Sequence, residues 1–523
     1  MDKALQMGKT SATGSFHLFI GQTTSTIILA LGTIILTRLM LPEEYGLYAI
    51  ALMPTMMITL FRDWGVNFAI TKYIANLRAK NKQNDIHDLL IAGLTFEVAT
   101  GLALSILSLL LANFIATTIF HRPQSASLIS IASITIFSGA LLTASNASFI
   151  GFEKMKLNSL TMICQSIVKS LAAPLLVLLG YGALGAIIGY TLSFLVAGTI
   201  GLIMLYFFFI KNLKRTKTNK TGISKTLKTM LHYGVPLSIS SILGGFRIQF
   251  YSFMMAFFCT DIMIGNYRAA INFAVLLTFF TFPIATVLFP AFSKLNPKNE
   301  HELLKNIFTS STKYTALLLV PATMAVIVLS KPMISTLFGE KWIYAPLFLT
   351  LYAINNLFVV FGRISMSSLL VGLGETKMLM KLSLLTMSIG LPLAFLLIPT
   401  LGITGVILGT IFAGLPSMFY GLHWIWKRYE VKADFKSSTK IFIASTIAAT
   451  TTYSSLTFIN TADWITLITG GIIFLATYTL VAPIIGAINQ SDINNLRTML
   501  SGLGIISKLI NIPLTLAERI MGS

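Results

Sequence analysis

The stretch that decides the fold is Thr37 to Ala51, T-R-L-M-L-P-E-E-Y-G-L-Y-A-I-A. It closes one long apolar run, turns through Pro42, Glu43 and Glu44, and opens a second apolar run. A weaker copy, I-G-N-Y-R, follows at Ile264 to Arg268, and its Gly265 lies 219 positions after Gly46. The stretch therefore predicts a short loop between two membrane helices and hints at an internal repeat.

Composition supports a location in lipid. The chain has 523 residues, of which 55% are hydrophobic and only 11% are charged, whereas about a quarter of the residues of a soluble protein are charged. The apolar runs reach about 20 residues, the length that a helix needs to cross the bilayer. They are continuous rather than alternating, which is typical of helices and not of barrel strands. We expect an all-α polytopic membrane protein.

The apolar runs give fourteen candidate spans. The first is too long for a signal-peptide core, so we expect it to be retained. The two cysteines, Cys164 and Cys259, imply no disulfide framework. The spans are 16–39, 46–70, 89–115, 127–150, 157–179, 184–210, 233–258, 265–292, 314–337, 345–371, 382–399, 403–426, 441–459 and 464–486.

The basic residues predict the orientation of these spans. If the N-terminus is cytoplasmic, 29 of the 38 Lys and Arg residues fall in cytoplasmic segments, five fall on the outer side of the membrane and four lie within spans. Cytoplasmic loops retain positive charge, so both termini are expected in the cytoplasm of a cell-membrane protein. Seven of these charges lie in residues 211–231, which we interpret as a topology anchor and linker attracted to anionic lipid, or alternatively as a partner-binding segment.

Three further pairs of segments match across this linker. Residues 112–120 match 330–338 at an offset of 218, residues 151–154 resemble 372–377 at 221, and residues 182–185 resemble 402–405 at 220. With Gly46 and Gly265, these ordered offsets predict two parallel six-helix bundles, with a substrate site between them.

The repeat also predicts the domain boundaries. We expect bundles at 1–210 and 232–430, the linker between them, and two additional spans within 431–488. Residues 489–523 form a tail in which apolar residues from Ile493 to Leu509 recur every three or four positions before Pro513. This pattern predicts an amphipathic helix on the inner membrane face, or alternatively a docking site for an enzyme of the same pathway.

Sequence motifs for catalysis are missing. The chain has no G-x-x-x-x-G-K-[ST] loop and no H-E-x-x-H motif, and its six histidines have no ligand neighbours at helical spacing. We expect no enzymatic activity, no cofactor, no metal and no nucleic-acid partner.

Six ionisable residues lie well inside the expected spans, away from their ends. A charge facing lipid at mid-span costs about 2.5–3.5 kcal/mol on insertion scales, so these residues should face protein or water. They could pair internally, for example Asp63 or Glu97 with Lys169, but four cations and two anions leave a surplus of positive charge. Such a surplus suits an anionic substrate such as a phosphate or diphosphate. The two acids could instead couple transport to H+ or Na+. The cations are Arg62, Lys169, Arg247 and Arg363, and the acids are Asp63 and Glu97.

Five sequence blocks resemble a known family. Residues 37–48 are similar to the first-loop pattern R-x-L-x-P-x-x-Y-G-x-Y of the polysaccharide-transport family of oligosaccharide flippases, within the multidrug/oligosaccharidyl-lipid/polysaccharide exporter superfamily. Residues 151–156, 233–236, 338–341 and 369–377 resemble later blocks. The resemblance covers about residues 15–430. It departs at Leu41, where glycine is frequent, and at Tyr251, where many members have an acid.

The resemblance implies a function. It implies a carrier that moves a polyprenyl-diphosphate-linked oligosaccharide from the cytoplasmic to the outer leaflet by alternating access, with membrane lipid and polysaccharide-assembly enzymes as partners. A cation-coupled multidrug exporter of the same superfamily is one alternative, although it would need an acidic and aromatic cavity. A membrane enzyme of polysaccharide assembly is another, although such enzymes usually carry a large outer loop and none here exceeds about 15 residues.

Overall fold

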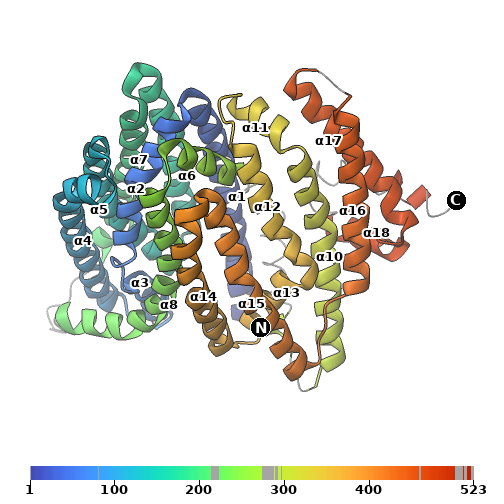
Figure 1. Cartoon of the computed structure of the whole chain (residues 1–523). Coiled ribbons are helices and arrows are strands. Elements are labelled where there is room, and N and C mark those ends of the chain that lie inside the picture. The colour runs from blue at the N-terminus through green and yellow to red at the C-terminus, as the bar shows by residue number, and fades with distance from the viewer. Residues whose placement is uncertain are drawn as a thin grey trace. The chain divides into compact units, whose positions relative to one another are not determined.

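The computed structural model shows a helical chain (Figure 1). It describes residues 2–80, 82–213, 223–273, 299–458 and 461–500, together with the positions 288, 292–295, 297, 511, 515, 516, 518 and 519. No strand occurs in this part of the chain. The all-α class expected from the sequence is confirmed.

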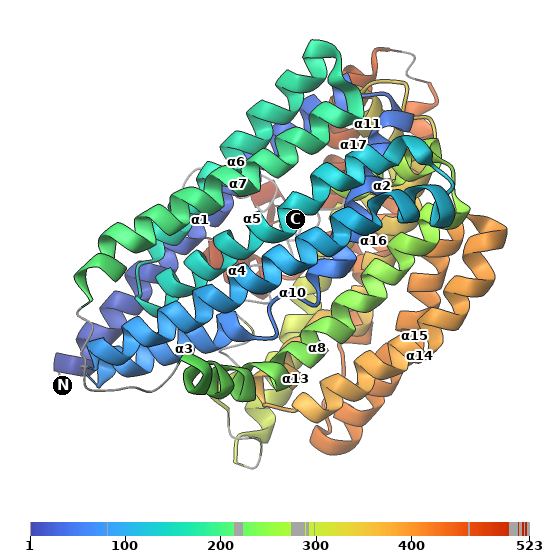
Figure 2. The same ribbon diagram turned by 90° about the vertical axis from the view of Figure 1, so that its left-hand side faces the viewer.

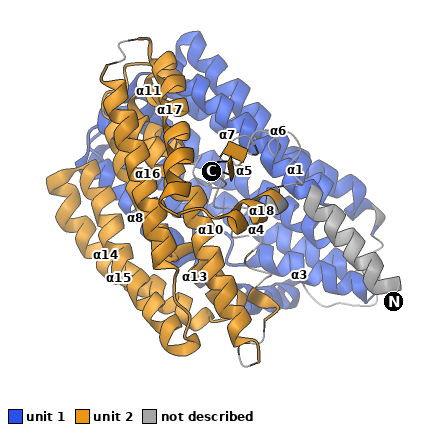
Figure 3. Cartoon of the chain, turned by 90° about the vertical axis from the view of Figure 1, so that its right-hand side faces the viewer, with its two compact units in different colours: residues 1–265 blue, residues 266–523 orange. Residues whose placement is uncertain are grey.

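The chain divides into two compact units, residues 1–265 and 266–523 (Figure 3). In unit 1, the helix pairs α6 with α7, α1 with α6, α5 with α7 and α4 with α5 pack along their lengths (Figure 2). The helices of unit 1 are α1 (Asp2–Leu39), α2 (Pro42–Thr59), α3 (Val66–Ala79), α4 (Gln83–Phe114), α5 (Ala126–Gly151), α6 (Met155–Leu176), α7 (Gly182–Phe208) and α8 (Ile223–Phe258). Short turns of other helix types lie at Ile115–Ile119, Pro123–Ser125, Val177–Tyr181 and Ile210–Asn212.

Unit 2 is built mainly from helical hairpins. The pairs α14 with α15 and α16 with α17 are its most extensive contacts, and α10 packs against α16. Its helices are α10 (His301–Val328), α11 (Ser330–Phe338), α12 (Ala345–Leu357), α13 (Arg363–Gly372), α14 (Thr376–Leu401), α15 (Ile403–Tyr429), α16 (Phe435–Leu456), α17 (Asp463–Ile484) and α18 (Gln490–Leu500), with a 3-10 turn, η5, at Phe358–Phe361.

The boundary between the units differs from the boundary of the sequence repeat. The repeat assigns the span 233–258 to the second half, whereas the corresponding helix α8 lies in unit 1. The reason is packing, because α8 contacts α2, α3 and α4. Residues 214–222 of the basic linker and most of the expected span 265–292 lie outside the described residues.

Many helices are long enough to cross a membrane. Among the described residues, eight helical stretches have the length and apolar composition of a span, and the bent pair α12–α13 would make a ninth. One of the eight, Met155–Phe208, contains both α6 and α7. The chain reverses between them at Gly180 and Gly182, whose φ angles of 90° and 48° lie in the left-handed region that suits glycine. These stretches make the chain a multi-pass membrane protein.

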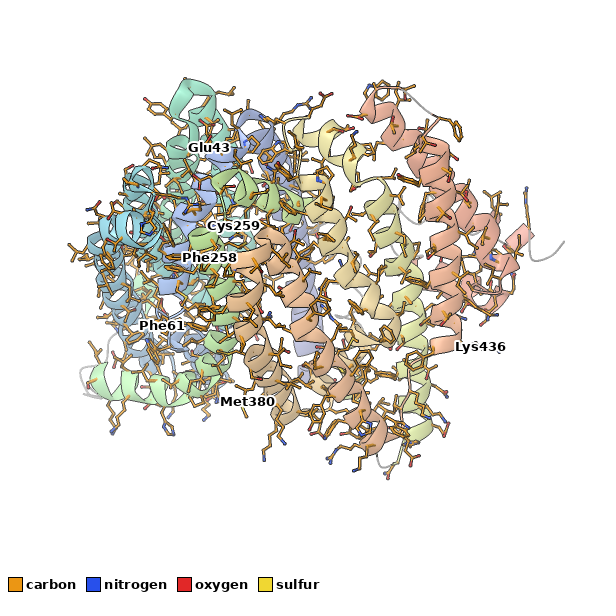
Figure 4. All side chains as sticks on the ribbon, viewed as in Figure 1. Glu43, Phe61, Phe258, Cys259, Met380 and Lys436 are labelled. Carbon is orange, nitrogen blue, oxygen red and sulfur yellow. The ribbon has the colours of Figure 1, made fainter. Side chains whose placement is uncertain are left out.

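Two of the expected spans are broken helices. The span 46–70 divides into α2 and α3, and Figure 4 shows Phe61, next to this break, at the opposite end of α2 from Glu43. The span 345–371 divides into α12 and α13, which bend by 61°. A glycine with left-handed φ precedes the second helix of each pair, Gly65 at 79° and Gly362 at 86°. Arg62 and Asp63 lie in the first break and Arg363 directly follows the second, so three of the six intramembrane charges lie at helix breaks.

The first loop packs against its own repeat inside unit 1. A Cβ on Gly46 would overlap the carbonyl oxygen of Asp261, and a Cβ on Gly265 would overlap the carbonyl oxygen of Pro42. Both positions therefore need glycine for close backbone contact. Gly265, which repeats Gly46 in the sequence, therefore also lies in close backbone contact with the first loop.

The tail begins with a docked helix. In α18, Asp492 forms an ion pair with Lys313 of α10 at 2.7 Å, and Asp492 is 2% exposed. Asn495 donates a hydrogen bond to the Tyr314 hydroxyl at 2.7 Å. The remainder of the expected amphipathic helix, residues 501–510, and Pro513 lie outside the described residues.

Candidate functional site

The broken helix α2–α3 carries the charged site of unit 1. Trp64 and Gly65 both have left-handed φ angles, 48° and 79°, so the chain turns sharply before Val66. An Asp63 carboxylate oxygen accepts a hydrogen bond from the backbone amide of Asn67 at 2.9 Å. This contact satisfies a free amide in the first turn of α3. Asp63 therefore has a structural role at the start of the helix.

Arg62 points into the protein from the same turn. Its Nη2 donates to the Thr143 hydroxyl at 2.8 Å and its Nη1 donates to the Ile136 carbonyl at 3.3 Å. A Cβ on Gly139 would lie only 2.9 Å from the Arg62 Nη1 atom. Glycine at this position of α5 thus makes room for the guanidinium group.

Glu97 of α4 balances the charge of Arg62. The Arg62 Nε atom lies 3.5 Å from Glu97 Oε2, and the two side chains are 7% and 0% exposed. Asn67 donates to Glu97 Oε1 at 3.1 Å. The Asp63 carboxylate also interacts electrostatically with both Arg62 and Glu97. The cluster therefore contains one cation and two carboxylates.

Arg62 and Glu97 form an ion pair without a close hydrogen bond between the facing atoms. Neither Arg62 Nε nor Glu97 Oε2 has a hydrogen-bond partner among the described residues, although both atoms are buried and face each other. Buried polar atoms without partners are uncommon and invite a functional explanation. The pair is close enough for charge attraction but too long for a strong hydrogen bond.

A cavity opens beside Arg62. Its volume is about 270 Å³, and its wall comes from α2, α5, α7, α8 and Arg62 itself. Four threonines, two aromatic rings and one amide contribute most of the polar and aromatic surface. The lining residues are Leu52, Thr55, Met56, Thr59, Arg62, Thr135, Gly139, Thr143, Tyr190, Phe194 and Gln249.

The other predicted cations belong to three different helices, α6, α8 and α13. Lys169 of α6 is half-buried, with its Nζ atom 4.9 Å from the centre of the Tyr190 ring, which lines the cavity. Arg247 of α8 is half-buried, two positions before Gln249. Neither cation forms an ion pair with a described carboxylate. Arg363 belongs to unit 2, where it is exposed and donates to the Asn355 side chain at 3.0 Å.

Sequence reasoning missed the uncharged residues of the cavity. Tyr190, Gln249 and Thr55 are single polar side chains in apolar helices, a pattern that is common in membrane proteins and gives no functional signal by itself. Their convergence on one cavity is visible only in the fold. The internal pairing that the sequence offered as an alternative, with Lys169, also differs from the observed partner of Glu97, which is Arg62.

Comparison with known protein families identifies the family of the chain. A family model described as "Polysaccharide biosynthesis protein" matches residues 11–296, more than half of the chain. The chain belongs to this family. The matched region of this polysaccharide biosynthesis protein contains Arg62, Glu97, Lys169 and Arg247, but not Arg363.

Two curated relatives of this family member are named as flippases. It is 22% identical over 280 residues to a probable low-salt glycan biosynthesis flippase of Haloferax volcanii, covering 52% of this chain and 57% of that protein. It is 27% identical over 302 residues to the probable lipid II flippase MurJ of Helicobacter pylori, covering 54% of this chain and 64% of that protein. The chain thus matches less than two thirds of the length of each.

Solved structures show the same fold. A lipid II flippase MurJ in an inward closed conformation is similar with a TM-score of 0.72 and 16% identity, covering 89% of this chain and 98% of that one. A multidrug resistance transporter of the MATE family, in an inward-facing conformation, is similar with a TM-score of 0.63 and 18% identity, covering 78% and 94%. The chain therefore shares a fold with both kinds of transporter.

Proposed function

We propose that this protein is a flippase for a polyprenyl-diphosphate-linked oligosaccharide. It carries the sugar-bearing head group from the cytoplasmic to the outer leaflet of the cell membrane by alternating access, for assembly of a surface polysaccharide or glycan. Both of its termini are cytoplasmic. It works on membrane lipid and hands its product to polysaccharide-assembly enzymes.

One observation supports this proposal most strongly. A family model described as "Polysaccharide biosynthesis protein" matches residues 11–296, and relatives over about half of the chain are named as flippases of a glycan and of lipid II. The multidrug transporter shares the fold alone, at 18% identity. Lys169 and Arg247 of unit 1 form no ion pair with a described carboxylate, which favours an anionic cargo over the organic cations that a multidrug exporter carries.

The cations have distinct roles in the proposal. Lys169 and Arg247 bind the diphosphate, because each lies half-buried in a membrane helix without a carboxylate partner among the described residues. Arg363 of unit 2 contributes to the same head group at another stage of the cycle. Arg62 contacts the cargo from the cavity wall while Glu97 balances its charge.

Ion coupling is assigned to Glu97. Asp63 and Glu97 are the two acids of the Arg62 cluster, but Asp63 lies in the break before α3 and is engaged by the first turn of that helix. Glu97 has no exposed surface and faces Arg62, so loading it with H+ or Na+ would change the force that holds Arg62. A gradient of either ion would then bias one conformation.

Deletion of the gene tests the proposed function. Lipid-linked oligosaccharide should accumulate in the cytoplasmic leaflet, where it is protected from an impermeant glycan-modifying enzyme added outside intact spheroplasts. Loss of the lipid-linked oligosaccharide itself would point to an enzyme of synthesis. Unchanged exposure on the outer leaflet would refute the flippase.

Complementation then tests the cations. A double variant Lys169→Met and Arg247→Met should fail to restore export although it reaches the membrane. The matched control is Lys377→Met with Lys381→Met, two exposed lysines of α14, which should restore export fully. Full export by the first variant would overturn the assignment of the diphosphate site.

A further inference from the structure

We propose that the cavity beside Arg62 is a subsite for a single sugar residue of the cargo, and that Tyr190, Gln249 and Thr55 determine which glycan is carried. This proposal rests on the proposed flippase function and goes beyond it. It separates the recognition of the glycan from the recognition of the diphosphate, which is assigned to Lys169 and Arg247.

Three polar groups in the cavity wall lack partners. The Thr55 hydroxyl is buried, with the residue 3% exposed, and has no hydrogen-bond partner among the described residues. Gln249 and Tyr190 are half-buried and line the same cavity, and their side chains make no hydrogen bond within the described chain. A buried hydroxyl such as that of Thr55 usually has a partner. A ligand with several hydroxyl groups would supply such partners.

The chemistry of the wall matches a sugar. Hydroxyl and amide groups both donate and accept hydrogen bonds, as sugar hydroxyls do. The rings of Tyr190 and Phe194 lie with their centroids 5.1 Å apart, tilted by 49°, and form an aromatic corner in the cavity wall. The C–H face of a pyranose ring packs well on such a surface. The combination of aromatic rings with neutral hydrogen-bonding groups suits a carbohydrate.

The charge of the site disfavours the diphosphate. Arg62 is the cation in the cavity wall, and Glu97 lies 3.5 Å from its Nε atom. The Asp63 carboxylate interacts with the same pair. At the Arg62 end of the cavity, a diphosphate would meet one cation backed by two carboxylates, so attraction and repulsion would largely cancel there. A neutral polar group meets no such opposition.

The size of the cavity limits the ligand. A cavity of about 270 Å³ lies just below the range of about 300–1,000 Å³ that small-molecule pockets span. This space accommodates one pyranose ring with its hydroxyl groups. It is too small for an oligosaccharide, so one sugar of the chain enters and the others lie outside it.

Binding measurements on the purified full-length protein test the subsite. The two probes are the lipid-linked oligosaccharide extracted from the host membrane and polyprenyl diphosphate of the same chain length without sugar. The variants are Thr55→Val and Gln249→Leu, which remove unpartnered polar groups and keep side-chain bulk, and Tyr190→Phe, which removes a hydroxyl. The control is Thr199→Val, an exposed threonine of α7.

The expected result is a selective loss. The wild-type protein should bind the glycosylated lipid more tightly than the bare lipid, and the Thr55→Val and Gln249→Leu double variant should lose at least tenfold in affinity for the glycosylated lipid only. Its melting temperature should match that of the control. Equal loss for both probes, or no loss, would overturn the subsite. Binding of neither probe by the wild type would overturn the flippase proposal instead.

Discussion

Gly65 and Gly234 meet backbone to backbone. A Cβ on Gly234 would lie 2.5 Å from the carbonyl oxygen of Gly65, and a Cβ on Gly65 would overlap the carbonyl group of Gly234. Gly65 ends the break between α2 and α3, and Gly234 lies inside α8. The contact holds α8 against the broken helix that carries Arg62. The Tyr233–Pro236 block of the sequence thus has a packing role.

We expect Gly234→Ala to destabilise unit 1. Overpacking typically costs about 1–3 kcal/mol, because the added methyl group must push α8 away from Gly65. Gly244→Ala in the same helix has nothing within 4 Å of its new Cβ and should be neutral or stabilising by up to about 1 kcal/mol. Denaturant unfolding in detergent measures both variants. Equal shifts of the two midpoints would contradict the close contact.

We also expect Arg122 to resist replacement by lysine. Its guanidinium group donates to Asp261 and to the carbonyl oxygens of Phe120, Ala256 and Cys259. An ammonium group cannot reach this planar set of acceptors. Arg122→Ala should lower the free energy of unfolding by about 3 kcal/mol, as expected for a largely buried ion pair. Arg122→Lys should therefore lower it by almost as much.

The control for Arg122 is an exposed pair. Arg78 lies 3.5 Å from Glu153, with side chains 38% and 57% exposed, so Arg78→Ala should cost under about 1 kcal/mol. The same unfolding assay compares the two arginines. A lysine at position 122 that restores wild-type stability would show that charge alone, and not the fork of donors, holds the turn after α8.

The sequence predicted the membrane class and the intramembrane charges because both depend on local composition. Runs of apolar residues identify spans wherever they lie, and Arg62 or Glu97 within such a run is conspicuous. The repeat was also visible, since Gly46 and Gly265 keep their neighbours. These features need no knowledge of which helices touch.

The partners of each charge could not be predicted, because they depend on tertiary packing. Arg62 contacts Ile136 and Thr143, which are 74 and 81 positions away in the chain. The need for glycine at 139 arises only from the guanidinium group that it faces. The assignment of α8 to unit 1 likewise follows from contacts with α3 and α4, and the repeat pattern alone placed it in the second half.

The tail should loosen when its ion pair is removed. Asp492 pairs with Lys313 and also accepts a hydrogen bond from the Asn489 backbone amide at 2.9 Å. Asp492→Asn keeps a hydrogen-bond acceptor but removes the charge, so hydrogen exchange across 490–500 should become faster by about tenfold or more. Glu302→Gln, at an exposed pair with Lys305, is the control and should leave exchange in the tail unchanged. Unchanged protection in Asp492→Asn would show that apolar contacts alone dock α18.

We expect the stability losses caused by replacing Arg62 and Glu97 to be strongly non-additive. Removing one partner leaves a buried charge uncompensated, which costs about 3–5 kcal/mol, whereas replacing both by apolar residues of similar volume is often nearly neutral. Arg62→Met and Glu97→Leu should each reduce the yield of folded protein, and the double variant should recover most of it. Detergent melting and membrane yield measure this coupling. Additive losses would mean that the loose contact of 3.5 Å carries little energy.

The same double variant separates folding from ion coupling. If Glu97 carries the coupling ion, the folded double variant should no longer respond to an H+ or Na+ gradient in proteoliposomes, while slow gradient-independent movement of lipid-linked oligosaccharide remains. The conservative variant Glu97→Asp keeps the charge and should retain part of the response. A double variant that still responds fully to either gradient would exclude Glu97 as the coupling site, because its carboxylate is absent from that variant. Asp63, the other carboxylate that interacts with Arg62, would then remain as the candidate.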